Sequence, residues 1–307
     1  MAIADYEAHA LKGIKESHDL GAKTAMDKYL KIPIFNFENT SEFEETFTST
    51  EGATGSKELS PDETPPDVTL KEGYSVTLKD KRFGGAIVLN EEERAQGRSN
   101  QTKVSTYLTR ARNAVLRDNL YLLVTNIYGM LNNGFSSSAA TLAPDGVELF
   151  GTHTWNGGGT FTNAATAALA LASVNTMEAY AGAFTMQDGK QRPLSFDTII
   201  VKKGGSASIT AKQLFAEKIA PTAIADINIY QGSKTVIEVP YITSATAWFA
   251  LDNMVKESPL YVGMNQYPTM RAPKELENEG IRTNVTGFYK YGINVLPFNI
   301  YGSTGAA

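Results

Sequence analysis

The chain has 307 residues, a formal net charge of −5 at pH 7 and no cysteine. Its length allows one large domain or two smaller ones, and the absence of cysteine excludes disulfide bonds, thiolate catalysis and cysteine-ligated zinc. The mildly acidic balance argues against a free DNA- or RNA-binding factor, because such proteins usually have a basic domain. The sequence shows neither a membrane-spanning apolar stretch of ~18 residues nor a secretory signal.

The first 67 residues divide into a helical part and an acidic part. Residues 2–30 have apolar side chains at roughly helical spacing, which predicts two helical pieces. Residues 36–67 contain nine acidic residues and one lysine, with glycines and prolines that oppose regular structure. This composition predicts either a solvated acidic loop or an extended arm.

Residues 71–89 alternate between apolar and polar side chains. Tyr74, Val76 and Leu78 share one face, and a second alternating arm begins at Phe83. This period of two predicts a β-hairpin over residues 71–89. A two-stranded hairpin is marginally stable by itself, so we expect it to lie on a neighbouring copy of the chain.

Residues 99–133 give the clearest helical pattern. Ser99 or Asn100 can cap the start, and Gly134 follows the end. A helix of this length spans roughly 45–50 Å. One apolar stripe is predicted, and basic residues lie on or beside the helix. The stripe contains Val104, Leu108, Ala111, Val115 and Leu122, and the basic residues are Arg98, Lys103, Arg110, Arg112 and Arg117.

The second half of the chain predicts several short strands. Residues 198–201 are a β-branched run that ends at a Lys-Lys-Gly-Gly turn, and a short helix with Thr210 as its N-cap is expected over 210–215. Further predicted elements are a helix over 177–184 and strands over 236–242, 247–251, 260–262 and 288–295.

The order of these segments resembles the major capsid proteins of tailed bacteriophages, the Hong Kong 97 phage-type fold. Pro193 to Val201 resembles the family's proline, loop and strand unit, and Val236 to Asp252 resembles its "Val-x-x-Pro … Trp-x-Leu-x-Asp" unit. Leu149 to His153 and the Tyr291-Gly292 pair resemble two further motifs. The likeness covers residues 30–301, and the helix over 99–133 corresponds to the family's long spine helix.

The resemblance implies an α+β architecture with peripheral and axial domains. The expected division is an N-terminal arm (1–67), an extended hairpin loop (68–97), a peripheral domain with the spine helix (98–169), an axial domain (170–256) and C-terminal strands of the peripheral domain (257–307). Because the arm starts soon after Met1, no fused scaffolding segment is expected, and the resemblance implies a separate scaffolding protein.

Catalytic, cofactor and metal sites are not expected. Of the three histidines, His9 and His18 lack the i,i+4 spacing of a metal face, and His153 is expected to bond to local backbone. Residues 157–160 and 204–206 are glycine turns without the P-loop or Rossmann pattern. The acidic run 91–93 is expected to be a solvated connection.

Contacts between subunits are the predicted sites. Acidic residues of the arm and basic residues of the spine helix have opposite signs, so we expect them to meet between subunits, at least in part; the basic residues alternatively form a solvated face or contact DNA phosphates. Lys79 and Lys81 are expected near the hairpin tip, where a few family members carry a cross-linking lysine. The candidate contact residues are Glu42, Glu44, Glu45, Glu51, Tyr74, Val76, Lys79, Lys81, Phe83, Arg110, Arg112 and Arg117.

The function that the resemblance implies is structural. Many copies would form the pentamers and hexamers of an icosahedral virion capsid, assembled in the host cytoplasm around double-stranded DNA bound without sequence specificity, with a scaffolding protein, a portal and a decoration protein as further partners and no membrane. Two alternatives are an encapsulin-like shell that holds an enzyme cargo, and a hydrolase that uses His153 with a nearby carboxylate.

Overall fold

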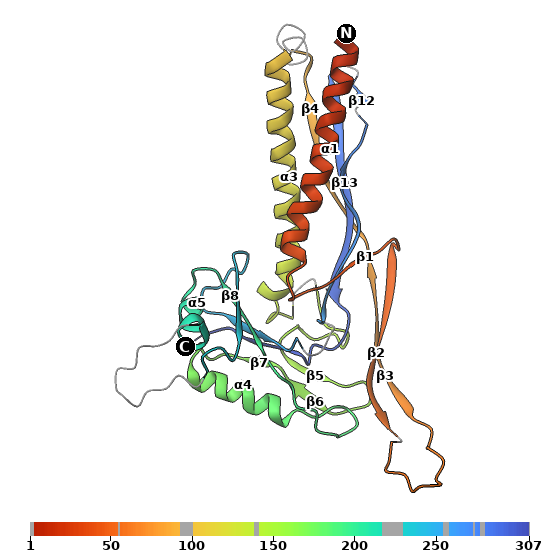
Figure 1. Cartoon of the computed structure of the whole chain (residues 1–307), viewed down its shortest axis with the longest axis vertical. Helices are drawn as coiled ribbons and strands as arrows, with labels where there is room; N and C mark the ends of the chain where they lie inside the picture. The colour runs from red at the N-terminus through yellow and green to blue at the C-terminus, as the bar shows by residue number, and fades with distance from the viewer. Residues whose placement is uncertain are drawn as a thin grey trace.

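The structure is a computed structural model that describes residues 3–54, 56–92, 101–137, 141–216, 230–253, 258–272, 274–276 and 280–306. It mixes helices with two five-stranded sheets, which confirms the α+β prediction. Figure 1 shows a tall part, in which two long helices lie along one sheet, a compact part built on the other sheet, and a hairpin that extends away from both. We call the two sheets the peripheral sheet and the axial sheet.

The spine helix is present where the sequence predicts it. Helix α3 (Gln101–Asn132) has 32 residues, a length of ~48 Å. The predicted stripe is partly wrong, because Leu122 is 42% exposed while the neighbouring Leu123 is fully buried. Leu122 turns away from the elements that cover α3, whereas the buried face contains Leu123, Val124, Ile127, Tyr128, Met130 and Leu131. The side chains of Val104 and Leu108 lie outside the described residues.

Helix α1 (Ile3–Leu30) is one continuous helix rather than the two predicted pieces. Ala22, Met26 and Leu30 recur every four residues on its buried face, which is the spacing of a single helical stripe. Gly21 lies against Leu116 of α3, where an added Cβ would sit 3.4 Å from the leucine side chain. Tertiary packing along α3 and the peripheral sheet therefore keeps the helix intact through its glycines (Figure 1).

The peripheral sheet combines strands from the N-terminal third and the C-terminal part of the sequence. Its central strand β13 (Ile281–Ile293) pairs on one edge with β4 (Lys81–Leu89) and on the other with β11 (Leu260–Met270) and the short β12 (Lys274–Glu275). Strand β1 (Asn36–Asn39) then adds to β11 in parallel. Apolar side chains of β4 and β13, among them Ile87 and Val285, face Ala111 and Val115 of α3.

The axial sheet has the order β7-β14-β10-β8-β9. Strands β8 (Thr198–Lys202), β9 (Thr235–Val239) and β10 (Trp248–Leu251) confirm the strands predicted at 198–201, 236–242 and 247–251. Strand β14 (Ile300–Ser303) pairs with β10, and β7 (Ala164–Ala165) pairs with β14. The chain thus returns to the axial sheet near its C-terminus, although the sequence suggested that residues 257–307 belong with the peripheral strands.

Two helices flank the axial sheet. Helix α4 (Leu171–Ala183) contains most of the predicted 177–184 segment. Helix α5 (Ser206–Ala211) begins four residues earlier than predicted, because Gly205 rather than Thr210 is its N-cap. A Cβ on Gly205 would lie 2.6 Å from the carbonyl oxygen of Ala245, so the helix start requires glycine there. A π-helical turn (Lys212–Ala216) continues α5.

The predicted hairpin over 71–89 is wrong in its pairing. Strand β3 (Thr69–Lys79) pairs with β2 (Glu44–Thr54), whereas β4 pairs with β13. Only Asp80 separates β3 from β4, and a hairpin there would require at least a two-residue turn. The extended hairpin of this chain is therefore β2–β3, and residues 44–54 form a strand where an irregular acidic segment was expected. A smaller hairpin joins β5 (Thr152–Thr154) to β6 (Thr160–Thr162).

Candidate interaction surfaces

His153 is a structural residue in the geometry observed. Its side chain is fully buried, its Nδ1 lies 3.0 Å from Asp145 Oδ2, and its Nε2 lies 3.3 Å from the carbonyl oxygen of Leu149. Both ring nitrogens are thus engaged, and the expectation that the ring bonds to local backbone is confirmed. Among the residues that the structure describes, no group of three or more His, Cys, Asp or Glu side chains could hold a metal ion.

The side chain of Asp145 is only 3% exposed, but its hydrogen bonds stabilise the charged carboxylate. Burial alone raises the pKa of this carboxyl, but the hydrogen bond and charge of His153 and the backbone N–H groups of Thr154 and Val147 outweigh burial, so the pKa lies below its ordinary value. The pair anchors the turn before β5 rather than presenting a base to solvent.

The glycine-rich segments are turns, as predicted. Gly158, Gly159 and Gly204 have φ values of 94°, 88° and 73°, a left-handed conformation that favours glycine. Such turns require no ligand. Glu91 and Glu92 follow β4 after Asn90 and are exposed, as expected of a solvated connection, while residue 93 lies outside the described residues.

The β2–β3 hairpin has a polar face made of hydroxyl pairs. Thr46 Oγ1 and Thr77 Oγ1 are 2.9 Å apart, as are Thr48 Oγ1 and Ser75 Oγ, and all four residues are exposed. On its other face Tyr74, Val76 and Leu78 are half-buried, which confirms the alternation predicted for this segment. Cross-strand hydroxyl pairs contribute only ~0.2–1 kcal/mol each, so the hairpin needs a second source of stability.

Lys290 supplies that stability at the base of the hairpin. This lysine of β13 is fully buried, and its Nζ donates to the carbonyl oxygen of Glu42 at 2.6 Å and lies 3.2 Å from Glu45 Oε2 and 3.9 Å from Asp80 Oδ1. Glu42 and Glu45 are at the entry to β2, and Asp80 follows β3. One buried cation therefore ties both ends of the hairpin to the peripheral sheet, since a buried charge is stable only when it is paired.

Three further residues complete this network. The hydroxyl of Tyr261 donates to Glu45 Oε2 at 2.9 Å, and Asn265 Nδ2 donates to Asp80 Oδ2 at 2.7 Å. Gly263 leaves room for the lysine stem, because a Cβ there would lie 2.9 Å from Lys290 Cγ. Lys290 is not among the site residues predicted from the sequence, although its position between two tyrosines of an apolar strand was an available signal.

Asp80 is the weakly satisfied member of the network. Burial raises the pKa of this carboxyl above its ordinary value, against the opposing hydrogen bond of Asn265 and the charge of Lys290, and the charge of Glu45 raises it further. Its Oδ1 accepts no hydrogen bond from the described residues. The base of the hairpin therefore contrasts with the Asp145–His153 pair, where every charge has a close partner.

The acidic candidates Glu44 and Glu45 have partners in their own chain. Glu44 Oε1 lies 2.7 Å from Lys79 Nζ, with both side chains more than half exposed, and Glu45 belongs to the Lys290 network. These two carboxylates therefore have cationic partners within the subunit, and their contact with α3 of a second copy stays a prediction. The Glu51 side chain lies outside the described residues, and Glu42 is exposed.

The basic candidates lie on α3, apart from the hairpin in the subunit (Figure 1). Arg112 donates to Ser17 of α1 and to Asn113, so it joins the two long helices. Arg110 and Arg117 are exposed, and their contact with a second copy stays a prediction. Arg98 and the Lys103 side chain lie outside the described residues.

Lys79 and Lys81 do not lie at a hairpin tip. They flank the junction of β3 with β4, where the ammonium of Lys81 lies 4.1 Å from the ring centroid of Tyr291, a cation–π contact. Phe83 is buried against Tyr289 in the peripheral sheet. The tip of the hairpin is instead the 55–68 connection, of which residues 56–68 are described.

Comparisons with known proteins find likeness in structure alone. No family model matches the sequence, and no curated protein matches it. The capsid of an empty GTA particle aligns with 89% of this chain and 88% of its own at 11% identity, with a TM-score of 0.53. A structure from Mycobacterium phage Patience aligns over 94% of this chain and 85% of its own, also at 11% identity and a TM-score of 0.53.

These likenesses extend over nearly the whole chain, so they concern the complete arrangement of helices, sheets and hairpin. The chain has the α+β fold of tailed-phage major capsid proteins, the Hong Kong 97 type, as its segment order predicted. Among the described residues, no helix is long and apolar enough to cross a membrane.

Proposed function

We propose that this chain is a major capsid protein, the structural subunit of an icosahedral virus shell. Many copies would form pentamers and hexamers and enclose double-stranded DNA. The observation that carries the proposal is the likeness in fold to a capsid subunit over 89% of the chain. A structural role requires no active site, which agrees with the buried, fully engaged ring of His153.

Apolar side chains that its own chain leaves uncovered support self-assembly. Along the hairpin and at its base, Phe43, Leu59, Val68 and Leu70 are 61%, 40%, 51% and 62% exposed. Grouped exposed apolar side chains mark interaction sites more often than isolated ones do. Obligate assemblies bury ~2,000–5,000 Å² at each interface, and the projecting hairpin provides surface for such contacts with neighbouring copies.

The contact residues expected from the sequence remain part of this proposal. Tyr74, Val76 and Lys79 lie on the hairpin, and Arg110 and Arg117 offer exposed charges on α3 to a neighbour or to DNA phosphates. DNA would be held through its backbone and without sequence specificity. A separate scaffolding protein, a portal and a decoration protein would complete the particle, located in the virion after assembly in the host cytoplasm.

Electron microscopy of the expressed chain tests the proposal. We expect closed shells of uniform diameter after expression with a candidate scaffolding protein, with pentameric and hexameric units on their surface. Monomers or irregular aggregates under all assembly conditions would contradict it. Particles that contain a protein cargo and no DNA would instead indicate an encapsulin-like compartment, and turnover lost on His153→Ala would indicate a hydrolase.

A further inference from the structure

The β2–β3 hairpin loses its regular pairing about halfway along its strands. Beyond the Thr48–Ser75 pair, two residues of β3 lie opposite one residue of β2, and a second register shift follows at once in β2. We call residues 49–52 and 72–74 the bulged section. β-Bulges disrupt the ladder locally, bend the strand and increase its twist, so the bulged section influences the direction of the outer part of the hairpin.

An amide side chain from the compact part of the subunit binds the bulged section. Asn156 lies in the turn between β5 and β6, and its Nδ2 donates to the carbonyl oxygens of Glu72 and Gly73 at 3.3 and 3.2 Å. A strand carbonyl ordinarily bonds to the neighbouring strand, whereas at this point the donor belongs to a different hairpin. Asn156 therefore links the extended hairpin to the β5–β6 hairpin at the bulges.

The β5–β6 turn is a firm support for Asn156. The backbone N–H of Trp155 donates to the carbonyl oxygen of Gly159 at 3.0 Å, and the Trp155 ring is buried in the apolar cluster that includes residues of β8 and β10. Gln187 lies across the turn so closely that a Cβ on Gly157 would be 2.1 Å from its Nε2. Packing against the axial sheet therefore fixes the position of the amide.

The bulged section also has an apolar contact with the compact part. The half-buried Tyr74 packs against the same apolar cluster, and the adjacent Gly73 is buried. Ser49 of β2 donates its hydroxyl to the carbonyl oxygen of Tyr74 at 3.4 Å, which keeps the two strands together across the bulge. The middle of the hairpin is thus seated on the compact part, with Asn156 at an exposed position of the contact.

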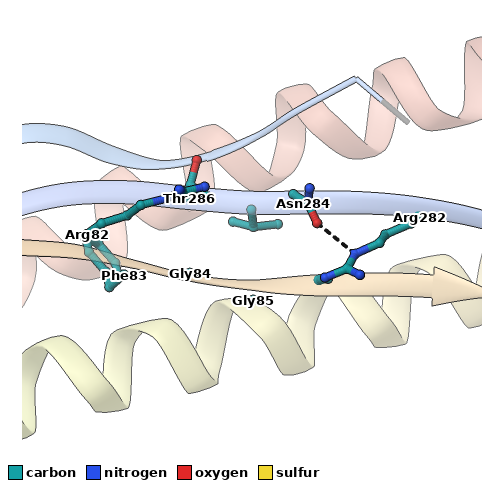
Figure 2. A pocket seen from close by; sticks show the side chains of 9 residues that line it. Arg82, Phe83, Gly84, Gly85, Arg282, Asn284 and Thr286 are labelled. Carbon is teal, nitrogen blue, oxygen red and sulfur yellow. Dashed lines mark hydrogen bonds between the residues drawn. The ribbon is translucent and has the colours of Figure 1, made fainter. Parts of the chain in front are cut away.

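The peripheral sheet holds the base of the hairpin separately. Lys290 binds the base through its carboxylates, and Leu78 packs so closely on β13 that a Cβ on Gly292 would lie 2.5 Å from it. Figure 1 shows the hairpin leading away from β4 and β13. The outer face of these two strands is an open groove of about 400 Å³, with Arg82 and Arg282 at its two ends (Figure 2). The sheet therefore anchors the base and leaves the direction of the hairpin to the second contact.

The two contacts differ in chemistry. The base combines a buried cation with carboxylates, whereas Asn156 forms two neutral hydrogen bonds at an exposed position. A hairpin fixed at its base alone can swing about that base, and it must give up this freedom when a neighbouring copy binds it. A second contact removes this cost, because it holds one direction in advance. We propose that Asn156 is a positioning residue that holds the hairpin in the direction in which neighbouring copies bind it, an inference that rests on the proposed capsid function.

Distances within the unassembled subunit test the positioning. Because the chain has no cysteine, spin labels can be attached to Thr24→Cys on α1 and Thr69→Cys on β3, both exposed positions, and their separation measured by pulsed electron paramagnetic resonance. We expect one narrow distance distribution, which Asn156→Ala should broaden and shift. Thr160→Ala, at an exposed position of the same β5–β6 hairpin, is the matched control and should leave the distribution unchanged.

Assembly rates test the consequence for the shell. Asn156→Ala should slow assembly about tenfold, the effect of losing two net hydrogen bonds, whereas Thr160→Ala should assemble at the original rate. In Glu72→Cys with Asn156→Cys, a short reducible thiol cross-linker replaces the lost bonds within one subunit. We expect the cross-linked subunits to regain the original rate and to lose it again on reduction. The reagent should not alter the rate of either single cysteine variant.

The outcomes separate the role of Asn156 from the shell function. Slow assembly of the cross-linked subunits would overturn the proposal, because a hairpin held at Asn156 would then point in a direction that neighbours do not bind. An unchanged distance distribution in Asn156→Ala would overturn it as well, since the base alone would then set the direction. In both cases the unmodified chain still forms shells and the capsid function stands. If the unmodified chain forms no particle at all, the capsid function fails, while the distance measurement still decides whether Asn156 holds the hairpin.

Discussion

The axial sheet and the extended hairpin are both made of β-strands, but their own chain completes only the axial sheet. Ile199, Ile200 and Val201 of β8 are fully buried, and β8 has a hydrogen-bonded neighbour on each edge. The β2–β3 hairpin is a two-stranded sheet with an exposed hydroxyl face, and its own subunit holds it through the buried Lys290 and through contacts of its half-buried face, such as Phe47 with Tyr261. The axial sheet therefore stabilises the subunit itself, whereas the hairpin keeps exposed surface that other copies of the chain can contact.

The largest effect is expected in the axial sheet. Ile200→Asp would place a carboxylate in a core without a partner, which should cost more than about 4 kcal/mol and prevent folding. Ile200→Val is the matched control and should cost about 1 kcal/mol. Solubility and circular dichroism after expression measure both, and a soluble, folded Ile200→Asp protein would show that the axial sheet is not the source of stability described above.

The second effect concerns the anchor of the hairpin. Lys290→Met keeps the stem of the side chain but leaves Glu45 and Asp80 without their cation, so we expect a loss of about 3 kcal/mol and slower assembly. Urea unfolding measures the stability, and light scattering measures the assembly.

An exposed ion pair on the same hairpin provides the control for Lys290. Lys79→Met removes the partner of Glu44 and should cost less than about 1 kcal/mol, because that pair is more than half exposed. Equal losses from the two lysine variants would contradict the role of Lys290 as the buried anchor.

Much of this contrast could be predicted from the sequence, because β8 and α3 carry strong local patterns. Residues 198–201 are a continuous β-branched run, and α3 keeps helical spacing over a long stretch. Each pattern identifies one element without reference to the rest of the chain. The partners of β3 and β4 could not be identified in this way. Both strands alternate correctly, but pairing depends on segments up to about 200 residues away, and period-two patterns do not specify which strand is the neighbour.

The contact sites show the same limit. The sequence indicates that residues 36–67 are acidic and that α3 is basic, but not that Glu44 and Glu45 find cations within their own subunit. Nor does it show that Arg82 and Arg282, 200 residues apart, share one groove. These juxtapositions are products of tertiary structure, so the signs of the charges alone do not identify them.

The third prediction uses the pH dependence of the buried carboxylate of Asp145. The pKa of Asp145 is lowered in the folded state, so its charge stabilises the fold at pH values above the unfolded pKa near 4, and this contribution is lost as the pH falls through the lower folded value. Asp145→Asn removes the charged acceptor of the hydrogen bonds from His153, Thr154 and Val147, so it should be less stable by about 2 kcal/mol at pH 7. The difference should shrink as the pH falls below about 4. Thermal unfolding at pH 7, 5 and 3 measures it, and a constant difference across this range would contradict the assignment.

The smallest effect on the subunit is expected at the tip of the hairpin. Replacing residues 56–67 with a short Gly/Ser turn removes a segment in which no described residue is buried, and changes at such surface positions usually alter stability by less than about 0.5 kcal/mol. Assembly should nevertheless fail, because the deletion removes the acidic loop and the exposed Leu59 while the anchor at Lys290 stays in place. Urea unfolding reports the first expectation and sedimentation velocity reports the second. If the shortened chain unfolds, the loop stabilises its own subunit; if it assembles normally, the tip makes no contact that the shell needs.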